Sequence, residues 1–391
     1  MAFRSVFLFL AVMLYSFLPT SCTKNENLPN PTLTEQTLFI YMPWSSNLTS
    51  HFEQNLKDLE LVIEKDILKN NRVIVLLASS PTEAAMFELK FEGGSSVRQT
   101  IKNYQDHFFT SANAITALLN DVVAIAPANR YAMVISGHGM GWLPISPASA
   151  PRSSEKKHWE YEGVALTRYF GGISPKYQVE ITTLASGIAN AELKMEFILF
   201  DDCYMSAIEV AYDLRAVTRY LIASPSEVMA YGFPYHIIGE DLINSNIEGI
   251  CKGFYDFYTN YVVMPCGTIA ATDCSELDRL ASIMKIINQQ HTFDIALADS
   301  VQTMDGYSPP IFFDYGDYVT KLCTNSNLLA QFEDQLNRAI PPQDRMHTPT
   351  YYTMSKGQVK INSFSGITIS DLSTNALAVA KTETNWYKAT H

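Results

Sequence analysis

The sequence predicts an α/β fold with a mostly parallel central sheet, on three observations. Six short apolar runs are each bounded by polar or turn residues, and their apolar character is continuous rather than alternating, as in strands buried on both faces. Segments with apolar residues every three to four positions separate these runs, which is typical of amphipathic helices. Strand and helix therefore alternate along the chain, and this order favours a parallel sheet covered by helices.

The expected elements follow one another in this order. The strands are 37–44, 72–79, 130–137, 196–202, 219–225 and 267–273. The helices are 51–69, 111–126, 206–217 and 275–290. Near the end of the chain, residues 358–372 have the pattern of a hairpin or of edge strands. We therefore expect a core domain over 37–300 and a less regular subregion over 301–391 that packs on it.

Composition restricts the class of protein and of partner. The chain has 391 residues, of which 47% are hydrophobic and 17% charged, so it can bury a large core. The formal charge of −12 carries no basic run, which disfavours nucleic acid or anionic lipid as a partner because phosphate binding needs clustered Lys and Arg. A cationic substrate suits this charge better.

The N-terminus has the pattern of an export signal over residues 1–21. Arg4 precedes an apolar stretch, 6–18, that is shorter than the about 20 residues of a membrane-spanning helix. Ser21 directly before Cys22 resembles a bacterial lipobox, so we expect a lipidated Cys22 followed by a flexible tether over 22–36. The alternative is an ordinary cleaved signal with an incidental Cys. Both imply export, and the first predicts a lipoprotein anchored in the periplasm or at the cell surface.

The remaining cysteines are odd in number, so at least one is unpaired within the chain. They are Cys203, Cys251, Cys266, Cys274 and Cys323. Their spacing does not say whether the last four form disulfides, and a free thiol in an oxidising compartment indicates either burial or catalysis. No zinc-protease motif, nucleotide loop or acidic calcium loop is present, so no metal or cofactor is expected, and a calcium requirement is left open.

Two candidate functional residues each follow an expected strand. His138 comes after 130–137 and Cys203 after 196–202, and ligands of parallel α/β sheets bind beyond such carboxyl ends. Cys203 also precedes the expected helix 206–217, whose N-terminus would favour a thiolate. Gly139 and Gly141 leave room for a substrate carbonyl at the backbone. These features suit acyl transfer, although a Cys after a strand is more often a buried small hydrophobe and a His near glycines is often a structural hydrogen-bonding residue.

Three motifs resemble the clostripain family of cysteine peptidases, relatives of the caspases, gingipains and legumains. They are "SGHGMGW" (136–142), "FDDCYMSAIEVAYDL" (200–214) and "IASPSEVMAYGFPY" (222–235). The resemblance implies a caspase-like α/β/α sandwich and a dyad of His138 and Cys203. It also implies oxyanion donors at the backbone N–H groups of Gly139 and Cys203. Asp202 stands where relatives often have Ala, and a carboxylate turned toward the thiol would disfavour its ionisation.

The resemblance also implies a preference for cleavage after Arg or Lys. Asp201 matches the family's acidic residue at the floor of the S1 pocket, and a buried carboxylate pairs well with guanidinium or ammonium. The alternative for Asp201 is a helix cap or turn residue. Ser224 and Glu227 are further candidates for the same pocket, and the alternative for Glu227 is a solvated loop charge.

Residues 144–177 are rich in Pro, Ser, Gly and charge, which is typical of a mobile insertion. Family members are often zymogens that cut themselves between the catalytic His and Cys. Arg152 is therefore the predicted self-cleavage site, with Lys156 and Lys157 close by in the same segment.

These inferences lead to one predicted function and two alternatives. The prediction is an exported, lipid-anchored, self-processing cysteine endopeptidase whose substrates are proteins or peptides with a basic P1 residue. One alternative is a catalytically silent surface lipoprotein that binds peptides or glycans. The other is the same fold with a different P1 choice, such as Asn or Asp.

Overall fold

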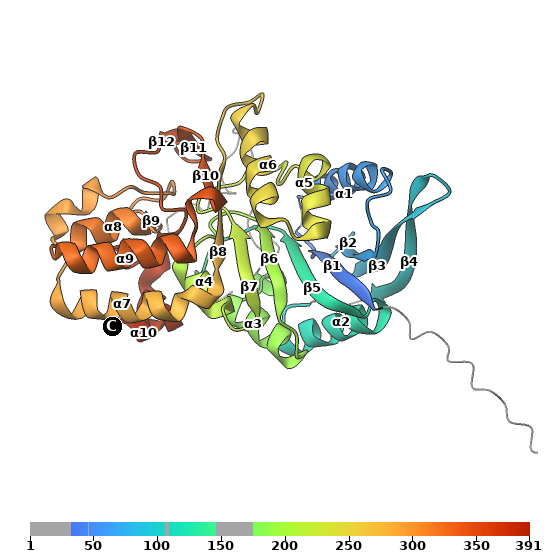
Figure 1. The fold of residues 1–391 in the computed structure, drawn as a ribbon, viewed down its shortest axis with the longest axis horizontal. Coiled ribbons are helices and arrows are strands. Elements are labelled where there is room, and N and C mark those ends of the chain that lie inside the picture. The colour runs from blue at the N-terminus through green and yellow to red at the C-terminus, as the bar shows by residue number, and fades with distance from the viewer. Residues whose placement is uncertain (1–32, 46, 106–108, 146–174) are drawn as a thin grey trace, which may run out of the picture. The chain divides into compact units, whose positions relative to one another are not determined.

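Nine strands of the described residues form one sheet in the computed structural model, which describes residues 33–45, 47–105, 109–145 and 175–391 (Figure 1). The order across the sheet is β10-β8-β7-β6-β5-β1-β2-β3-β4. Five adjacent central strands are parallel: β7 (Thr218–Ala223), β6 (Met195–Asp201), β5 (Ala128–Ser136), β1 (Thr34–Met42) and β2 (Asn71–Ala78). The parallel centre predicted from the continuous apolar runs is confirmed.

Each outer strand runs antiparallel to its neighbour. At both edges the sheet therefore differs from the parallel arrangement that the apolar runs predict. The outer strands are β8 (Thr268–Asp273), β10 (Arg345–His347), β3 (Glu83–Glu92) and β4 (Ser95–Gln105). We predicted β8 as a strand, but it runs against β7. The reason is that two helices rather than one connect them, so the chain is back at the carboxyl end of β7 when β8 begins.

The hairpin of β3 and β4 escaped prediction because β4 does not have a continuous apolar run. Most β4 residues are exposed, and Tyr104 is the buried exception. The two strands are joined by Gly93 and Gly94, with φ of 63° and 88°. A two-residue hairpin turn with positive φ at both positions is the type I′ geometry that glycine adopts without strain.

Helices cover both faces of the sheet, which gives the expected three layers (Figure 1). One face carries α1 (Thr49–Ile63), α5 (Tyr235–Asn244) and α6 (Ile247–Thr259), and the other carries α2 (Ala112–Ile125), α3 (Ile181–Asn190) and α4 (Ile208–Leu214). Along β1, Leu38 and Ile40 enter the first core while Phe39 and Tyr41 enter the second. A strand whose alternate side chains enter two cores must be apolar at every position, and this explains the continuous runs.

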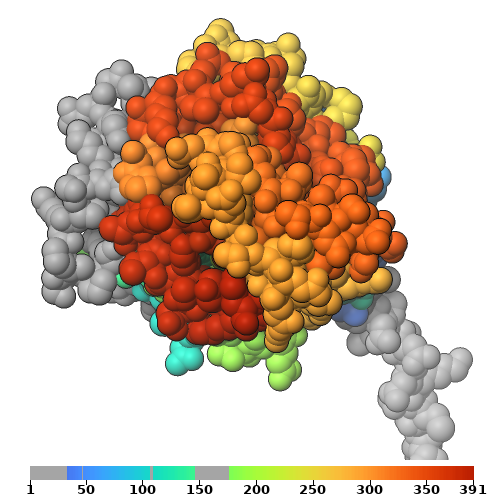
Figure 2. Space-filling view, turned by 90° about the vertical axis from the view of Figure 1, so that its left-hand side faces the viewer, coloured from blue at the N-terminus to red at the C-terminus, as the bar shows by residue number. Residues whose placement is uncertain are grey.

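The last part of the chain packs against the β8 end of the sheet, where the orange and red segments form the surface (Figure 2). Its helices are α7 (Leu277–Gln290), α8 (Tyr315–Leu322), α9 (Ser326–Ala339) and α10 (Asn385–Thr390), with 3-10 turns η3 (Cys274–Glu276), η4 (Ile295–Ser300), η5 (Pro342–Asp344) and η6 (Ala376–Glu383). Two small sheets lie beside them: β11 (Thr350–Thr353) with β12 (Gly357–Lys360), and β9 (Phe313–Asp314) with β13 (Thr368–Ile369). The strands expected in 358–372 are present: β12 closes a hairpin with β11, which begins before the expected range, and β13 pairs with the earlier strand β9.

The five cysteines within the described residues are all free and buried. Burial raises the pKa of the Cys266 and Cys274 thiols to about 12, so both are neutral at physiological pH. The disulfides that the spacing left open are therefore absent from this part of the chain. Within it, no helix is long and apolar enough to cross a bilayer.

Several predicted features lie outside the described residues. They are the signal peptide over 1–21, Cys22, the tether up to residue 32, and the self-cleavage candidates Arg152, Lys156 and Lys157. Residues 175–177 at the end of the predicted insertion form a short 3-10 turn, η2 (Pro175–Tyr177).

Candidate active site

His138 and Cys203 lie at the same edge of the sheet, beyond the carboxyl ends of two neighbouring parallel strands. The register of β5 and β6 sets Ser136 opposite Asp201, and each candidate follows its strand by two residues. Both side chains are fully buried. The structure therefore brings together two residues that are 65 positions apart in the sequence.

The backbone of Gly139 packs directly against the backbone of Cys203. A Cβ atom added to Gly139 would lie 2.0 Å from the carbonyl oxygen of Cys203 and 2.9 Å from its nitrogen. No other residue fits at this position, because real Cβ atoms do not approach backbone atoms so closely. The two backbone segments predicted to supply the oxyanion donors are in van der Waals contact.

The thiol of Cys203 contacts the backbone of Val228. The Val228 N–H donates to Sγ at 3.2 Å, and the Val228 carbonyl oxygen lies 3.7 Å from the same sulfur. The N–H contact favours the thiolate and the carbonyl contact favours the thiol, so the Val228 backbone can contact either form of Cys203.

The helix expected over 206–217 is present as α4, but it starts two residues later, at Ile208, and ends at Leu214. Tyr204 lies in a turn with a left-handed φ of 59°, and residues 205–207 lead from this turn into α4, so neighbouring loops take the hydrogen bonds of this segment. Tyr204 N–H donates to the Ser226 carbonyl and Ser206 N–H to the Ser224 carbonyl, both at 3.0 Å, while the Ser206 carbonyl accepts from Thr368 N–H at 3.0 Å. Local contacts with Val228, rather than a helix dipole, thus surround the sulfur.

A contact that the sequence analysis missed orients His138. Its Nε2 lies 2.7 Å from the amide oxygen of Asn47, in the loop between β1 and α1. An amide oxygen only accepts hydrogen bonds, so this contact favours the tautomer with the proton on Nε2 and the basic lone pair on Nδ1. Like His138 and Cys203, Asn47 lies after the carboxyl end of a strand. Its place in the sequence after an apolar run is the signal that could have identified it.

Asp201, the last residue of β6, is fully buried. Its Oδ1 accepts from the Phe233 N–H at 3.0 Å, and its Oδ2 accepts from the Ser136 hydroxyl at 3.3 Å and the Tyr235 hydroxyl at 3.4 Å. These three donors are uncharged, so they hold the carboxylate oxygens without cancelling a negative charge.

Comparison with known proteins shows the family to which this chain belongs. The sequence model of the clostripain family matches residues 40–340, which is most of the chain. The chain belongs to the clostripain family of cysteine peptidases. A search of curated proteins found no match.

Solved structures of similar proteins agree with this family. A secreted cysteine protease of Bacteroides thetaiotaomicron, called iotapain, is 59% identical over 92% of this chain and 100% of its own, with a TM-score of 0.85. A clostripain from the same species, in complex with the peptide inhibitor BTN-VLTK-AOMK, is 63% identical over 57% of this chain and 99% of its own, with a TM-score of 0.56. An inactive zymogen protease of Parabacteroides distasonis is 26% identical over 93% of this chain and 99% of its own, with a TM-score of 0.76.

In this clostripain-family chain, the other two candidates for the S1 pocket are both buried. Each carboxylate oxygen of Glu227 has a partner, the Tyr204 hydroxyl at 2.7 Å and the Met354 N–H at 3.1 Å. Its alternative interpretation as a solvated charge is therefore wrong. The Ser224 hydroxyl lies 2.8 Å from the Thr268 hydroxyl and accepts from the Ser226 N–H at 3.2 Å. Both residues brace the loop that contacts the Cys203 sulfur.

Aromatic packing holds the residue that follows the thiol. Tyr204 has a φ of 59° and stacks on Phe312 with ring centroids 4.9 Å apart. Gly141 has a φ of 60°, and a Cβ there would lie 2.9 Å from the Phe312 ring. In this peptidase, Tyr204, Phe312 and Gly141 thus pack closely together beside Cys203 and the glycines after His138. Among its described residues, no group of three or more His, Cys, Asp or Glu is arranged to hold a metal ion.

Proposed function

We propose that this protein is a cysteine endopeptidase that cleaves after Arg or Lys through Cys203 and His138. The observation that carries the proposal is the packing of Gly139 on the Cys203 backbone at the ends of β5 and β6. It supports a site in which one thiol, one imidazole and two backbone N–H groups meet at a single carbonyl.

In the proposed reaction, the Cys203 thiolate attacks the scissile carbonyl carbon. The oxygen becomes an oxyanion that accepts from the N–H groups of Gly139 and Cys203. Protonated His138 then gives its proton to the leaving amine, and a thioester remains on Cys203. Water attacks the thioester, His138 takes up the water proton, and the thiolate leaves. Asn47 holds the imidazole ring in position through Nε2 during both proton transfers.

Asp201 is the proposed floor of the S1 pocket. Uncharged donors hold its oxygens in a site that excludes water, and an anion in such a site attracts a guanidinium or ammonium group strongly. The inhibitor bound to the 63% identical clostripain has Lys as the last residue of its VLTK peptide, which supports a basic P1 over Asn or Asp.

We further propose that the chain is exported, anchored through Cys22 and self-processed near Arg152. A secreted protease and a zymogen are among the similar proteins, which supports export and activation by cleavage. The complete burial of His138 and Cys203 is what an uncut precursor requires, because a substrate cannot reach a buried thiol.

The test is a panel of fluorogenic peptides that differ only at P1, assayed with the wild type and with Cys203→Ala. We expect hydrolysis after Arg and Lys and a loss of at least about 10⁴-fold in Cys203→Ala, since removal of a nucleophile leaves only residual catalysis. Hydrolysis that survives in Cys203→Ala would remove the nucleophile assignment. A correctly folded wild type that binds peptides but cleaves none would favour the silent surface lipoprotein.

Self-processing has its own test on a denaturing gel. The wild type is expected to give two fragments and Cys203→Ala a single chain. Arg152→Ala, compared with Lys156→Ala and Lys157→Ala, should delay the cut the most. Identical fragments from wild type and Cys203→Ala would mean that another protease cuts the chain.

A further inference from the structure

We propose that a pocket at the carboxyl ends of β1 and β2 binds an apolar or aromatic side chain of the substrate at P3′, the third residue after the scissile bond. This inference rests on the proposed peptidase function and extends it to the leaving side of the substrate. We call the pocket the Trp44 pocket, and its main lining residues are Tyr41, Trp44, Ala78, Ala84, Phe109 and Tyr177.

The Trp44 pocket has a rigid apolar floor. Tyr41 and Phe109 are only 2% and 8% exposed, and the Tyr41 hydroxyl donates to the Phe109 carbonyl at 3.3 Å. Tyr104 packs edge-on against Phe109 with ring centroids 5.3 Å apart. Aromatic rings fixed in this way bind an apolar side chain without first having to be ordered.

One loop links the pocket to the candidate active site. Trp44 and Asn47 belong to the same loop after β1, and Asn47 contacts Nε2 of His138. The strand order places β1 next to β5, and β2 next to β1. Neighbouring strands are about 4.8 Å apart, so the pocket lies roughly 5–10 Å beyond the strand that carries His138.

The direction from Cys203 to His138 indicates which part of a substrate reaches the pocket. His138 protonates the leaving amine in the proposed reaction, so the residues after the scissile bond lie on the His138 side of the sulfur. In the sheet order β6-β5-β1-β2, the Trp44 pocket lies farther along in that direction. It is therefore placed for the leaving peptide rather than for the residues before the bond.

The faces of the sheet indicate which residue of the leaving peptide fits. Asp201 is held by Phe233 and Tyr235, which belong to the core under α1, α5 and α6, whereas Tyr41 and Phe109 belong to the opposite core. Successive side chains of an extended peptide point to opposite sides, so the pocket opposite P1 takes P1′ or P3′. The scissile bond lies between the ends of β6 and β5, so the pocket is roughly 7–12 Å from it, and at about 3.3 Å per residue this distance selects P3′.

One charge adds to this specificity. Glu83 lines the pocket, and its side chain is exposed, so the carboxylate lies at the mouth rather than in the floor. Acidic side chains at P3′ are expected to be the least favoured, because like charges repel.

The experiment uses the full chain and quenched-fluorescence peptides with a constant unprimed half ending in Lys. After the cleaved bond they carry Ala-Ala-X, where X is Phe, Trp, Leu, Ala or Asp. We expect kcat/KM for Phe to exceed that for Ala by roughly 10- to 100-fold, the range for one apolar group in a hydrophobic pocket. Trp44→Ala should bring this ratio close to one.

Two further variants separate pocket filling from general damage. Ala84→Leu fills the pocket from β3 and is expected to lower the Phe-to-Ala ratio as Trp44→Ala does. Tyr255→Ala is the matched control, because it truncates an aromatic side chain on α6, on the other face of the sheet, and should leave the ratio unchanged. As a measurement that needs no variant, Ala-Ala-Phe should inhibit the wild type more strongly than Ala-Ala-Ala.

The outcomes distinguish this inference from the function on which it rests. Equal cleavage of all five peptides, or a Phe preference that persists in both pocket variants, overturns the P3′ assignment and leaves the peptidase intact. Peptides that carry X at P1′ or P2′ are the comparison. A Phe preference that is stronger at one of those positions than at P3′ overturns the assignment as well. Absence of any cleavage by the wild type defeats the proposed function, and the inference with it.

Discussion

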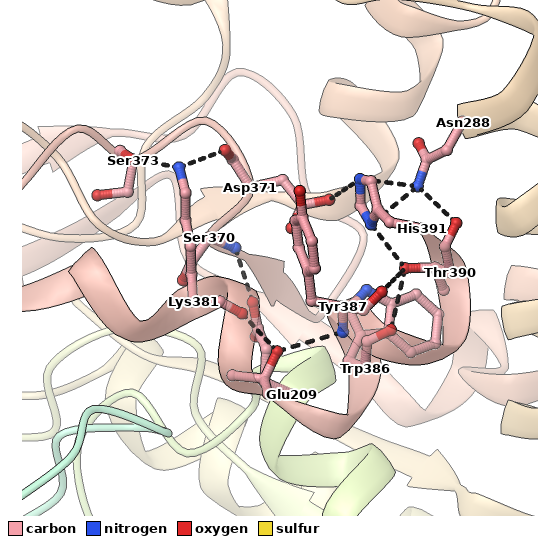
Figure 3. Close-up of polar contacts among 11 residues, drawn as sticks. Glu209, Asn288, Ser370, Asp371, Ser373, Lys381, Trp386, Tyr387, Thr390 and His391 are labelled. Atoms are coloured by element: carbon pink, nitrogen blue, oxygen red, sulfur yellow. Dashed lines mark hydrogen bonds and ion pairs between the residues drawn. The ribbon is translucent and has the colours of Figure 1, made fainter.

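The candidate active site and a cluster near the C-terminus are both buried and polar, yet they differ in what surrounds their charges. At the site, Asp201 accepts from three donors and lies at the open edge of parallel strands. In the C-terminal acid cluster, formed by Glu209, Asp371, Lys381 and His391, Glu209 on α4 and Asp371 lie beside the last residues of the chain (Figure 3).

The acids of this cluster accept fewer hydrogen bonds than Asp201 does. Glu209 is 2% exposed, and its Oε1 accepts from Ser370 N–H at 2.9 Å. Burial raises the pKa of Glu209 to about 8 and that of Asp371 to about 7. Lys381 donates to the backbone carbonyl of Asp371 at 2.7 Å, and the Nε2 of His391 is 3.9 Å from the Asp371 carboxylate.

The two regions together show that a carboxylate with a shifted pKa is not by itself evidence of a functional site. In the acid cluster the pKa shifts follow mainly from desolvation during packing of the C-terminal helices. At the candidate site, the functional indication comes from position, because two strand ends and two backbone segments converge there. Four predictions test this contrast.

The largest expected effect is that of His138→Ala at the candidate site. We expect kcat on a Lys peptide to fall by about 10²- to 10⁴-fold, the usual contribution of a general acid and base. Glu209→Gln, which perturbs only the acid cluster, is the control and should retain kcat at pH 6, where Glu209 is already protonated in the folded protein. Comparable losses in both variants would erase the contrast between the two regions.

Next is Trp386→Ala in the C-terminal region. Trp386 is fully buried and packs edge-on against Tyr212 at 5.3 Å and Tyr315 at 5.9 Å. Its truncation should lower the free energy of unfolding by about 3–5 kcal/mol, because the cavity between α10, α4 and α8 does not close. Urea denaturation of Cys203→Ala and Cys203→Ala/Trp386→Ala measures this without self-cleavage. An unchanged midpoint would mean that α10 contributes no stability.

Asp201→Asn should act on selectivity rather than on folding. The substitution keeps the size of the side chain but removes the charge, so kcat/KM for Arg and Lys peptides should fall by about 100-fold. Cleavage of a peptide with an uncharged P1 should change far less. Equal losses on basic and uncharged peptides would show that Asp201 supports the site structurally and does not bind P1.

The smallest effect, counted per pH unit, is the pH dependence of stability from the acid cluster. The pKa of Glu209 rises from 4.5 to about 8 on folding, and that of Asp371 from 3.8 to about 7. The folded state therefore holds more protons than the unfolded state between these values, and stability falls as pH rises from about 5 to 8. Each group contributes up to about 1.4 kcal/mol per pH unit.

Glu209→Gln should flatten that slope in urea unfolding of the Cys203→Ala chain at pH 5, 6, 7 and 8. Asp334→Asn is the control, because Asp334 is 68% exposed in a surface pair with Arg338. A slope that is the same in Glu209→Gln and in the parent would contradict the role of Glu209.

The sequence predicted the centre of the fold well and its edges poorly. Strands β1, β2, β5, β6 and β7 have continuous apolar runs because both faces are buried, and this is a local and readable pattern. The β3–β4 hairpin has no such run, although Gly93 and Gly94 were a usable turn signal. The direction of β8 could not be read, because it depends on how many helices precede it.

For the site, the sequence alone identified which residues have the chemistry: a Cys, a His, small glycines and an acid, each directly after an apolar strand. Only the tertiary structure decided their surroundings. The hydrogen bonds of 204–207 to neighbouring loops, the Val228 contact to the sulfur and the Asn47 contact to His138 all join segments distant in the chain. A sequence pattern reports the burial of each segment, whereas the partner of a polar atom depends on how separate segments pack together.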